Sequence, residues 1–216
     1  MPLCIQSHQL VPMAPKRGTL IRLEALLVFV LVSFSCGTVT QRIQDICNCL
    51  SVEPDALDYR HNAKHVALPT GTPQETDVST ILTWPVDLIP LPIDQPRTGR
   101  ELQLVHVALA YLENASVNPA DCDVHMEISQ TPDKTAPRII IETPIDSEYC
   151  SARQTVQNQL KQHGFTLDVQ HGGDLTQPLA VSVLGLPFED FEHPGGRGSA
   201  QVATLWEIHP AVVTFQ

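Results

Sequence analysis

The sequence CDVHMEISQTPDKTAPRIIIET, residues 122–143, contains two runs with the pattern of β-strands on either side of a polar turn that carries proline. In the first run polar and apolar residues alternate: Asp123, His125 and Glu127 with Val124, Met126 and Ile128. Successive side chains of a strand point to opposite faces of a sheet, so this alternation is typical of a strand with one buried face. The stretch predicts a β-hairpin that packs one face against the core.

Three further strand patterns lie outside the hairpin. Glu101–Glu113 (ELQLVHVALAYLE) places apolar residues on both faces, as in a strand that is covered on both sides. Leu179–Leu186 and Thr204–Phe215 follow later in the chain. Together with the hairpin, these runs predict five strands.

One segment has a clear helix pattern. Ser151 and Gln154 are spaced as in a capping box, Ser151–His163 continues as an amphipathic helix, and Gly164 can end it. Three strands, a helix and two strands is the order of an OB-fold barrel. We therefore predict a mainly β protein with a five-stranded OB-fold-like barrel and one helix between strands 3 and 4. A five-stranded sheet with the helix on one face is the main alternative.

The N-terminus has the organisation of a secretory signal. Lys16, Arg17 and Arg22 precede the uncharged apolar run Ala25–Ser35, and small residues continue to Gly37. An apolar run of this length is short for a membrane span. The pattern predicts export.

Two alternatives remain for this segment: an uncleaved membrane anchor, or lipid attachment at Cys36, which follows small residues. Under each of them the chain divides in the same way. Residues 1–37 are a signal segment, 38–100 an irregular proline-rich region and 101–216 the barrel domain.

The region 38–100 holds many of the 18 prolines of the chain, which predicts extended backbone lying over a surface. A short apolar stretch, Val78–Trp84, is expected to form one turn of helix or a strand. His61 and His65 are four residues apart, the spacing of some zinc sites. They lack the glutamate of a metalloprotease helix and prolines follow closely, so we expect solvated loop histidines.

Four cysteines lie beyond the signal segment: Cys47, Cys49, Cys122 and Cys150. Export permits disulfides. Cys122 opens the second strand and Cys150 follows the antiparallel third, which predicts a Cys122–Cys150 disulfide. The rival pairing joins Cys150 to Cys47 or Cys49.

The formal net charge is −11, and the basic residues Lys16, Arg17 and Arg22 fall in the signal segment. A surface this acidic repels phosphate backbones, so nucleic acid is not an expected partner. The expected partners are an unidentified ligand or an envelope component. Membrane contact is expected only through a signal anchor or a lipid on Cys36.

Four stretches resemble a family of secreted bacterial proteins without an assigned activity: CDVHMEIS, IIIETPIDSEYC, VSVLGLPFEDFEHPGGRG and LWEIHPAVV. The corresponding family motifs read DYHLVL, TMIAEIPDPAC, VTGVGFFDFLHGQTG and IELHPV. The resemblance covers about residues 98–215 and implies export and a shared fold. The polar residues that match are Asp123, His125, Glu142, Cys150, Asp190, His193, Glu207 and His209. Val124, Thr143 and Pro194 depart from the family pattern.

The candidate ligand-binding residues are the acids and histidines of the predicted strands and of the loop before the last one: Asp123, His125, Glu127, Glu142, Asp190, His193, Glu207 and His209. Within this set, His125, Glu142, Glu207 and His209 are the candidate ligands of a divalent metal, with His193 nearby, because imidazole and carboxylate suit zinc and similar ions. This site requires His125 and His209 to face the same side of the sheet. If they face opposite sides, the shared site does not exist. The plain alternative for these residues is that Asp123 and Glu127 are solvated strand residues and that Glu207 and His209 form cross-strand pairs.

Three function classes follow. OB barrels bind ligands on the face of their second and third strands, so the first, and the one that we predict, is an exported binding module for a cation, a sugar or a protein partner. The second is a metal-dependent hydrolase. The third is a structural envelope protein. No catalytic residue is assigned, because the chain has no nucleophile elbow and no phosphate-binding glycine loop.

Overall fold

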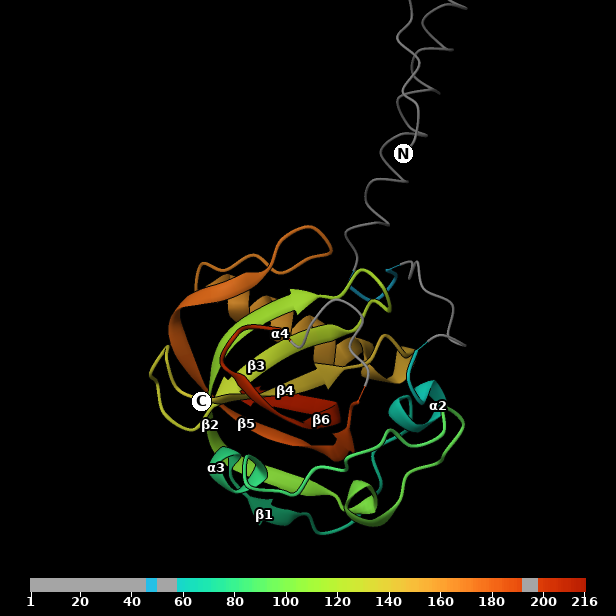
Figure 1. Ribbon diagram of the computed structural model, residues 1–216. Helices are drawn as coiled ribbons and strands as arrows, with labels where there is room; N and C mark the ends of the chain where they lie inside the picture. The colour runs from blue at the N-terminus through green and yellow to red at the C-terminus, as the bar shows by residue number, and fades with distance from the viewer. Residues whose placement is uncertain (1–45, 50–57, 192–197) are drawn as a thin grey trace, which may run out of the picture. The chain divides into compact units, whose positions relative to one another are not determined.

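The computed structural model describes residues 46–49, 58–191 and 198–216 (Figure 1). These residues belong to one compact unit. The predicted signal segment, Cys36 and His193 lie outside the described residues. The elements are α2 (His61–Lys64), β1 (Gln74–Thr76), α3 (Val78–Ile81), η2 (Gly99–Leu102), β2 (Val105–Val117), β3 (Val124–Ser129), β4 (Arg138–Thr143), η3 (Ser147–Tyr149), α4 (Cys150–Gln162), β5 (Gly173–Glu189) and β6 (Val202–Phe215).

Five strands close into a barrel in the order β2-β3-β4-β6-β5, and β5 pairs with β2 to complete the circle. The pairing of β4 with β6 is parallel, and the other barrel pairings are antiparallel. The helix α4 lies between β4 and β5 in the chain. The predicted OB-fold-like barrel is therefore confirmed. The short strand β1 adds to β2 in parallel outside the barrel.

The alternation within the hairpin decides which side chains fill the barrel. Val124, Met126 and Ile128 of β3 are fully buried and belong to the main hydrophobic core, together with Val156 and Leu160 of α4. Burying an aliphatic side chain of this size contributes roughly 1.5–3 kcal/mol. Figure 1 shows α4 behind the hairpin formed by β3 and β4.

The prediction that β2 is covered on both faces is wrong. Its register shifts between Val107 and Ala110, so the buried face changes after the irregularity. Val107 and Ala110 are both fully buried, whereas Leu109 is 41% exposed. The β-bulge therefore explains the apolar run: the strand turns one side to the core before the bulge and the other side after it.

The helix α4 spans Cys150–Gln162, close to the predicted bounds, but the predicted capping box is absent. Tyr149 is the N-cap residue and forms no side-chain cap hydrogen bond. The turn η3 leads directly into the helix, which places Ser151 inside its first turn. Gly164 adopts a φ of 75°, which suits its predicted role in ending the helix.

The proline-rich region before the barrel contains short elements that pack on it. Val78 and Ile81 of α3 are fully buried in the core, so the turn of helix expected there is confirmed. The ring of Trp84 meets Trp206 of β6 edge to face, with centroids 5.5 Å apart.

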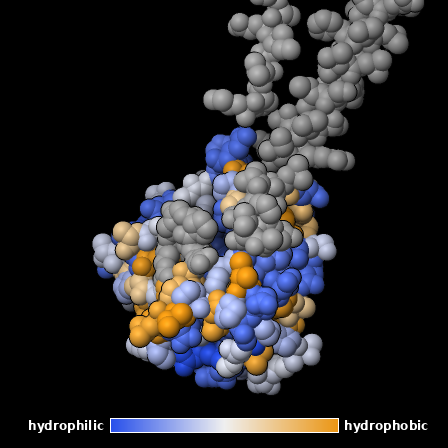
Figure 2. Space-filling model, turned by 45° about the vertical axis from the view of Figure 1, so that its right-hand side comes forward, coloured by the Kyte–Doolittle hydropathy of each residue, from blue (hydrophilic) through white to orange (hydrophobic). Residues whose placement is uncertain are grey.

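The face of the molecule shown in Figure 2 is largely hydrophilic, with hydrophobic areas separated from one another.

The predicted Cys122–Cys150 disulfide is wrong. The structure pairs Cys47 with Cys150, which is one of the rival pairings, and Cys49 with Cys122. The segment 46–49 reaches both barrel cysteines, so each of them bonds to it instead of to the other. The strand patterns could not predict this pairing, because they do not show where the segment 46–49 lies on the barrel.

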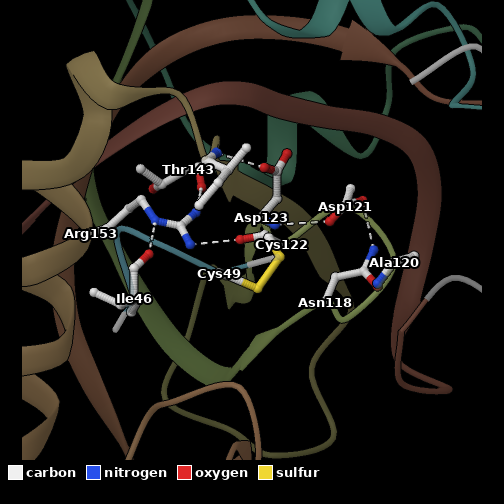
Figure 3. Close-up of a disulfide and its surroundings, with 10 residues drawn as sticks. Ile46, Cys49, Asn118, Ala120, Asp121, Cys122, Asp123, Thr143 and Arg153 are labelled. Carbon is white, nitrogen blue, oxygen red and sulfur yellow. Dashed lines mark hydrogen bonds between the residues drawn. A yellow bond between two sulfur atoms is a disulfide. The ribbon is translucent and has the colours of Figure 1, made fainter. Parts of the chain in front are cut away.

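Buried Arg153 fixes the same junction (Figure 3). Its guanidinium donates to the carbonyls of Ile46 at 2.7 Å, Thr143 at 2.9 Å and Cys122 at 2.6 Å. Two disulfides indicate an oxidising, extracytoplasmic environment. Within the described ranges, no helix is long and apolar enough to cross a membrane.

Candidate metal centre

The hairpin and the last strand present a polar face opposite to the core. Ile208 belongs to the core, so its neighbours Glu207 and His209 point to the other side of β6. On the hairpin, His125 lies directly opposite Glu142 in the ladder. This face is the outer side of the second and third barrel strands, where OB barrels bind their ligands.

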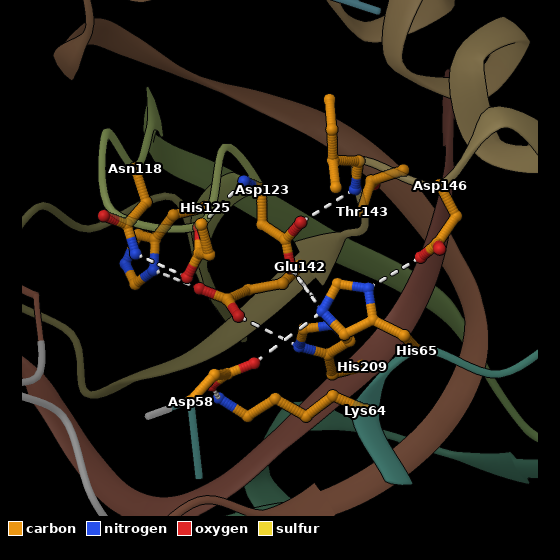
Figure 4. A network of polar contacts seen from close by, with 12 residues as sticks. Asp58, Lys64, His65, Asn118, Asp123, His125, Glu142, Thr143, Asp146 and His209 are labelled. Carbon is orange, nitrogen blue, oxygen red and sulfur yellow. Dashed lines mark hydrogen bonds and ion pairs between the residues drawn. The ribbon is translucent and has the colours of Figure 1, made fainter. Parts of the chain in front are cut away.

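The polar face is buried. Asp123 and Glu127 are each 1% exposed, so their interpretation as solvated strand residues is wrong. Part of the cover comes from the segment around α2 (Figure 4). Buried charged groups must be paired or bound to a metal, and the contacts of this face show how each group is compensated.

His209 lies at the centre of the face and is fully buried. Its Nδ1 is 2.9 Å from Glu142 Oε2 and 3.4 Å from Glu207 Oε1, and its Nε2 is 3.3 Å from Asp123 Oδ2. Burial disfavours the imidazolium, but Glu142, Glu207 and Asp123 outweigh it and raise the pKa of His209 to about 10. Three carboxylates therefore surround one imidazole.

Glu142 links two histidines. Its Oε1 lies 2.8 Å from Nδ1 of His125, and its Oε2 faces His209. Burial disfavours the carboxylate, yet these two imidazoles hold the pKa of Glu142 well below its ordinary value. For Asp123, burial outweighs His209 and raises the pKa to about 7.

The segment around α2 supplies a histidine that the sequence did not place here. The prediction that His61 and His65 are solvated loop residues is wrong for His65, whose side chain is 7% exposed. Its Nδ1 lies 2.7 Å from Asp146 Oδ2, and its Nε2 lies 3.9 Å from Asp123 Oδ2 and 3.8 Å from Asp58 Oδ2. Burial disfavours its charged form, but Asp58 and Asp123 raise the pKa of His65.

The four-residue spacing of His61 and His65 was the available signal. The missing glutamate and the nearby prolines argue against a zinc site there, and the sequence alone does not show that Asp123 and His209 lie beneath this turn. A neighbouring charge anchors the segment: buried Lys64 lies 3.1 Å from Asp58 Oδ1 and 2.9 Å from Asp190 Oδ2.

The predicted site residues therefore divide into two groups. The structure brings Asp123, His125, Glu142, Glu207 and His209 together, so His125 and His209 do face the same side. Glu127 instead pairs with Arg138 at 2.9 Å, and Asp190 pairs with Lys64.

Three overlapping sets of side chains can hold a metal ion in the described part of the chain, each with its ligand atoms within 4.8 Å of one another. They are Asp58, His61 and His65; His65, Asp123 and His209; and Glu142, Glu207 and His209. In the second set, Asp123 Oδ2 lies 3.3 Å from Nε2 of His209 and 3.9 Å from Nε2 of His65. A tetrahedral ion with ligands at about 2.0–2.1 Å keeps neighbouring ligand atoms about 3.4 Å apart. The second set fits this requirement.

A cavity of about 480 Å³ lies beside the centre and is lined by His125, Glu127, Ser199 and residues 168–174, among others. His125 is hydrogen-bonded to Glu142 and therefore connects the wall of this cavity with the buried histidines and carboxylates around His209.

No protein-family model matches the chain, and neither a curated protein nor a solved structure matches it. The function is therefore argued from the site.

Proposed function

We propose that this protein is an exported OB-fold module that binds one divalent metal ion of the zinc class through His65, Asp123 and His209. The observation that carries the proposal is the orientation of the two imidazoles. Their Nε2 atoms both face Asp123 Oδ2, at 3.9 Å for His65 and 3.3 Å for His209. Both Nε2 atoms are buried and form no hydrogen bond with the described residues.

The groups behind these ligands support the same reading. Metal-binding histidines generally place the second ring nitrogen on a carboxylate or carbonyl, which fixes the tautomer and the ring orientation. Here Nδ1 of His65 lies 2.7 Å from Asp146, and Nδ1 of His209 lies 2.9 Å from Glu142. The other oxygen of Asp123 accepts a hydrogen bond of 2.7 Å from the backbone N–H of Ile145.

The donor atoms select the class of ion. Two imidazole nitrogens and one carboxylate oxygen suit zinc and its neighbours among the divalent transition metals. The four described cysteines are in disulfides and offer no thiolate, which a soft ion such as Cu(I) would favour. Compared with the set expected from the sequence, His65 and Asp123 take the ligand positions, and Glu142 becomes a group that orients His209.

Export is part of the proposal and draws on the N-terminal signal pattern and on the two disulfides. The module would then acquire its ion outside the cytoplasm. A metal-dependent hydrolase and a structural envelope protein stay predictions from the sequence.

Zinc titration of the purified, disulfide-bonded full chain by calorimetry tests the proposal. We expect one equivalent to bind the wild type, His65→Gln to lose this binding and Asp123→Asn to weaken it strongly. His171→Gln is the matched control, because His171 is an exposed histidine paired with Asp168 at 2.9 Å. Cobalt absorption provides a second readout of a tetrahedral N/O site, and circular dichroism verifies that each variant is folded. A wild type that binds no zinc, or a folded His65→Gln that binds it like the wild type, overturns the proposal.

A further inference from the structure

The segment around α2 carries a second set of side chains that can hold a metal ion, on the more exposed side of the centre. Its members are Asp58, His61 and His65, with ligand atoms within 4.8 Å of one another. Asp58 Oδ2 lies 3.0 Å from Nδ1 of His61 and 3.8 Å from Nε2 of His65. The imidazole rings of His61 and His65 are stacked with centroids 4.0 Å apart. We call this set the outer position, and His65, Asp123 and His209 the inner position.

Exposure decreases from the outer to the inner position. The side chain of His61 is 25% exposed and that of Asp58 13%, whereas those of Asp123 and His209 are 1% exposed. A hydrated ion from solvent therefore meets His61 and Asp58 before it can reach Asp123 and His209.

The two positions share one ligand atom. Nδ1 of His65 is held by Asp146 at 2.7 Å, so Nε2 is the atom left for a metal in either position. An imidazole nitrogen has a single lone pair and binds one ion, unlike a carboxylate, which can bridge two. Simultaneous occupancy of both positions is therefore excluded, and the geometry does not form a two-metal site.

We infer that the outer position captures the hydrated divalent ion and passes it to the inner position through His65. The inference rests on the proposed function, because it assigns a route to the same ion. Lys64 keeps the outer carboxylate in place by its contact of 3.1 Å with Asp58 Oδ1 (Figure 4), which leaves Oδ2 directed at the two histidines. A buried metal site needs such a path.

The route predicts that His61 controls rates and not equilibrium binding. In stopped-flow exchange between the full chain and a chromophoric zinc chelator, we expect His61→Ala to slow both loading and release by about tenfold. The two rate constants must change by the same factor, because their ratio is the dissociation constant, which this change leaves unaltered. The stoichiometry should stay at one and the dissociation constant should stay within about twofold of the wild type, because no inner ligand is lost. His171→Ala, which removes an imidazole from an equivalent pair with an aspartate three residues earlier, should leave both rates unchanged.

A second variant examines the outer position by itself. His209→Asn removes an inner ligand and should leave one weaker and rapidly exchanging zinc site, which His61→Ala then abolishes in the double variant. The inference is overturned if His61→Ala exchanges zinc as fast as the wild type, or if the wild type binds two ions at once. Either result leaves the inner site intact, whereas a wild type that binds no zinc refutes the proposed function itself.

Discussion

The polar face of the β3–β4 hairpin has two ends that are equally buried and differ in the partners of their carboxylates. At one end, the arginine end, Glu127 Oε2 lies 2.9 Å from Arg138 Nη1, and Glu127 Oε1 accepts a hydrogen bond of 2.6 Å from Ser199 N–H. At the other, the imidazole end, Glu142 lies between His125 and His209. Both carboxylates are at most 2% exposed.

The difference between these ends concerns what each can exchange. A guanidinium stays charged at every accessible pH and has no lone pair for a metal, so the arginine end is a fixed ion pair. An imidazole can bind a proton or a divalent ion with the same nitrogen. A buried carboxylate is present at both ends, so burial does not distinguish them. They differ in the partner of the carboxylate, and only an imidazole partner can also bind a metal ion.

The largest effect is expected from Arg138→Leu. This change leaves Glu127 buried without its counter-ion, and breaking such a pair costs about 3–5 kcal/mol. Urea unfolding of the metal-free protein measures it. The double variant Arg138→Leu, Glu127→Leu should recover most of the loss, because it removes both charges. If the single variant is as stable as the wild type, the arginine end is not the structural ion pair described above.

Zinc itself should produce the next largest effect, and only through the imidazole end. At free zinc roughly 100-fold above the dissociation constant, the free energy of unfolding should rise by about 2.7 kcal/mol. The rise should be much smaller in His209→Asn, which keeps only the weaker outer position, and should persist in His171→Gln. Equal stabilisation of His209→Asn would place the ion elsewhere.

A smaller effect is expected from the carboxylate behind His65. Asp146→Asn weakens the contact that orients the ring, and losing such an outer partner reduces metal affinity by about 10–100-fold. Calorimetric zinc titration measures the change, which should lie near the lower limit because the side chain of Asp146 is 40% exposed. Asp174→Asn, at a carboxylate that is 64% exposed and pairs with Arg138, is the control and should bind zinc normally.

The smallest effect is expected from lowering the pH from about 5 to about 4, which should reduce the stability contributed by a second arginine–carboxylate pair. Arg60 binds Glu101 through two contacts of 2.7 Å, and although burial opposes it, this pairing lowers the pKa of Glu101 below its ordinary value of 4.5. The unfolded chain therefore takes up this proton first. The contribution to stability is complete above about pH 4.5 and is lost as the pH falls through the folded-state pKa, by at most about 1.4 kcal/mol per pH unit for one group. Urea unfolding at about pH 5 and pH 4 should show the decline, and Glu101→Gln should make it shallower; an unchanged slope contradicts this assignment.

The sequence by itself determined the barrel. Alternation in residues 122–143 separates Val124, Met126 and Ile128, which enter the core, from Asp123, His125 and Glu127, which do not. The order of three strands, a helix and two strands then leaves few possible topologies, among them the OB-fold barrel. These features follow from local geometry, since the period of a strand and the position of a helix are properties of neighbouring residues.

Tertiary structure alone decided which histidines and cysteines meet. His65 reaches Asp123 across 58 residues of chain, and Cys47 reaches Cys150 across 103. The bulge in β2 likewise depends on its pairing with β5 and is invisible in the apolar run. Such contacts are fixed by how distant segments pack on the finished barrel, because no local pattern encodes the partner of a side chain that lies on another element. The barrel face could therefore be predicted from its strands, whereas the segment that completes the candidate metal centre could not.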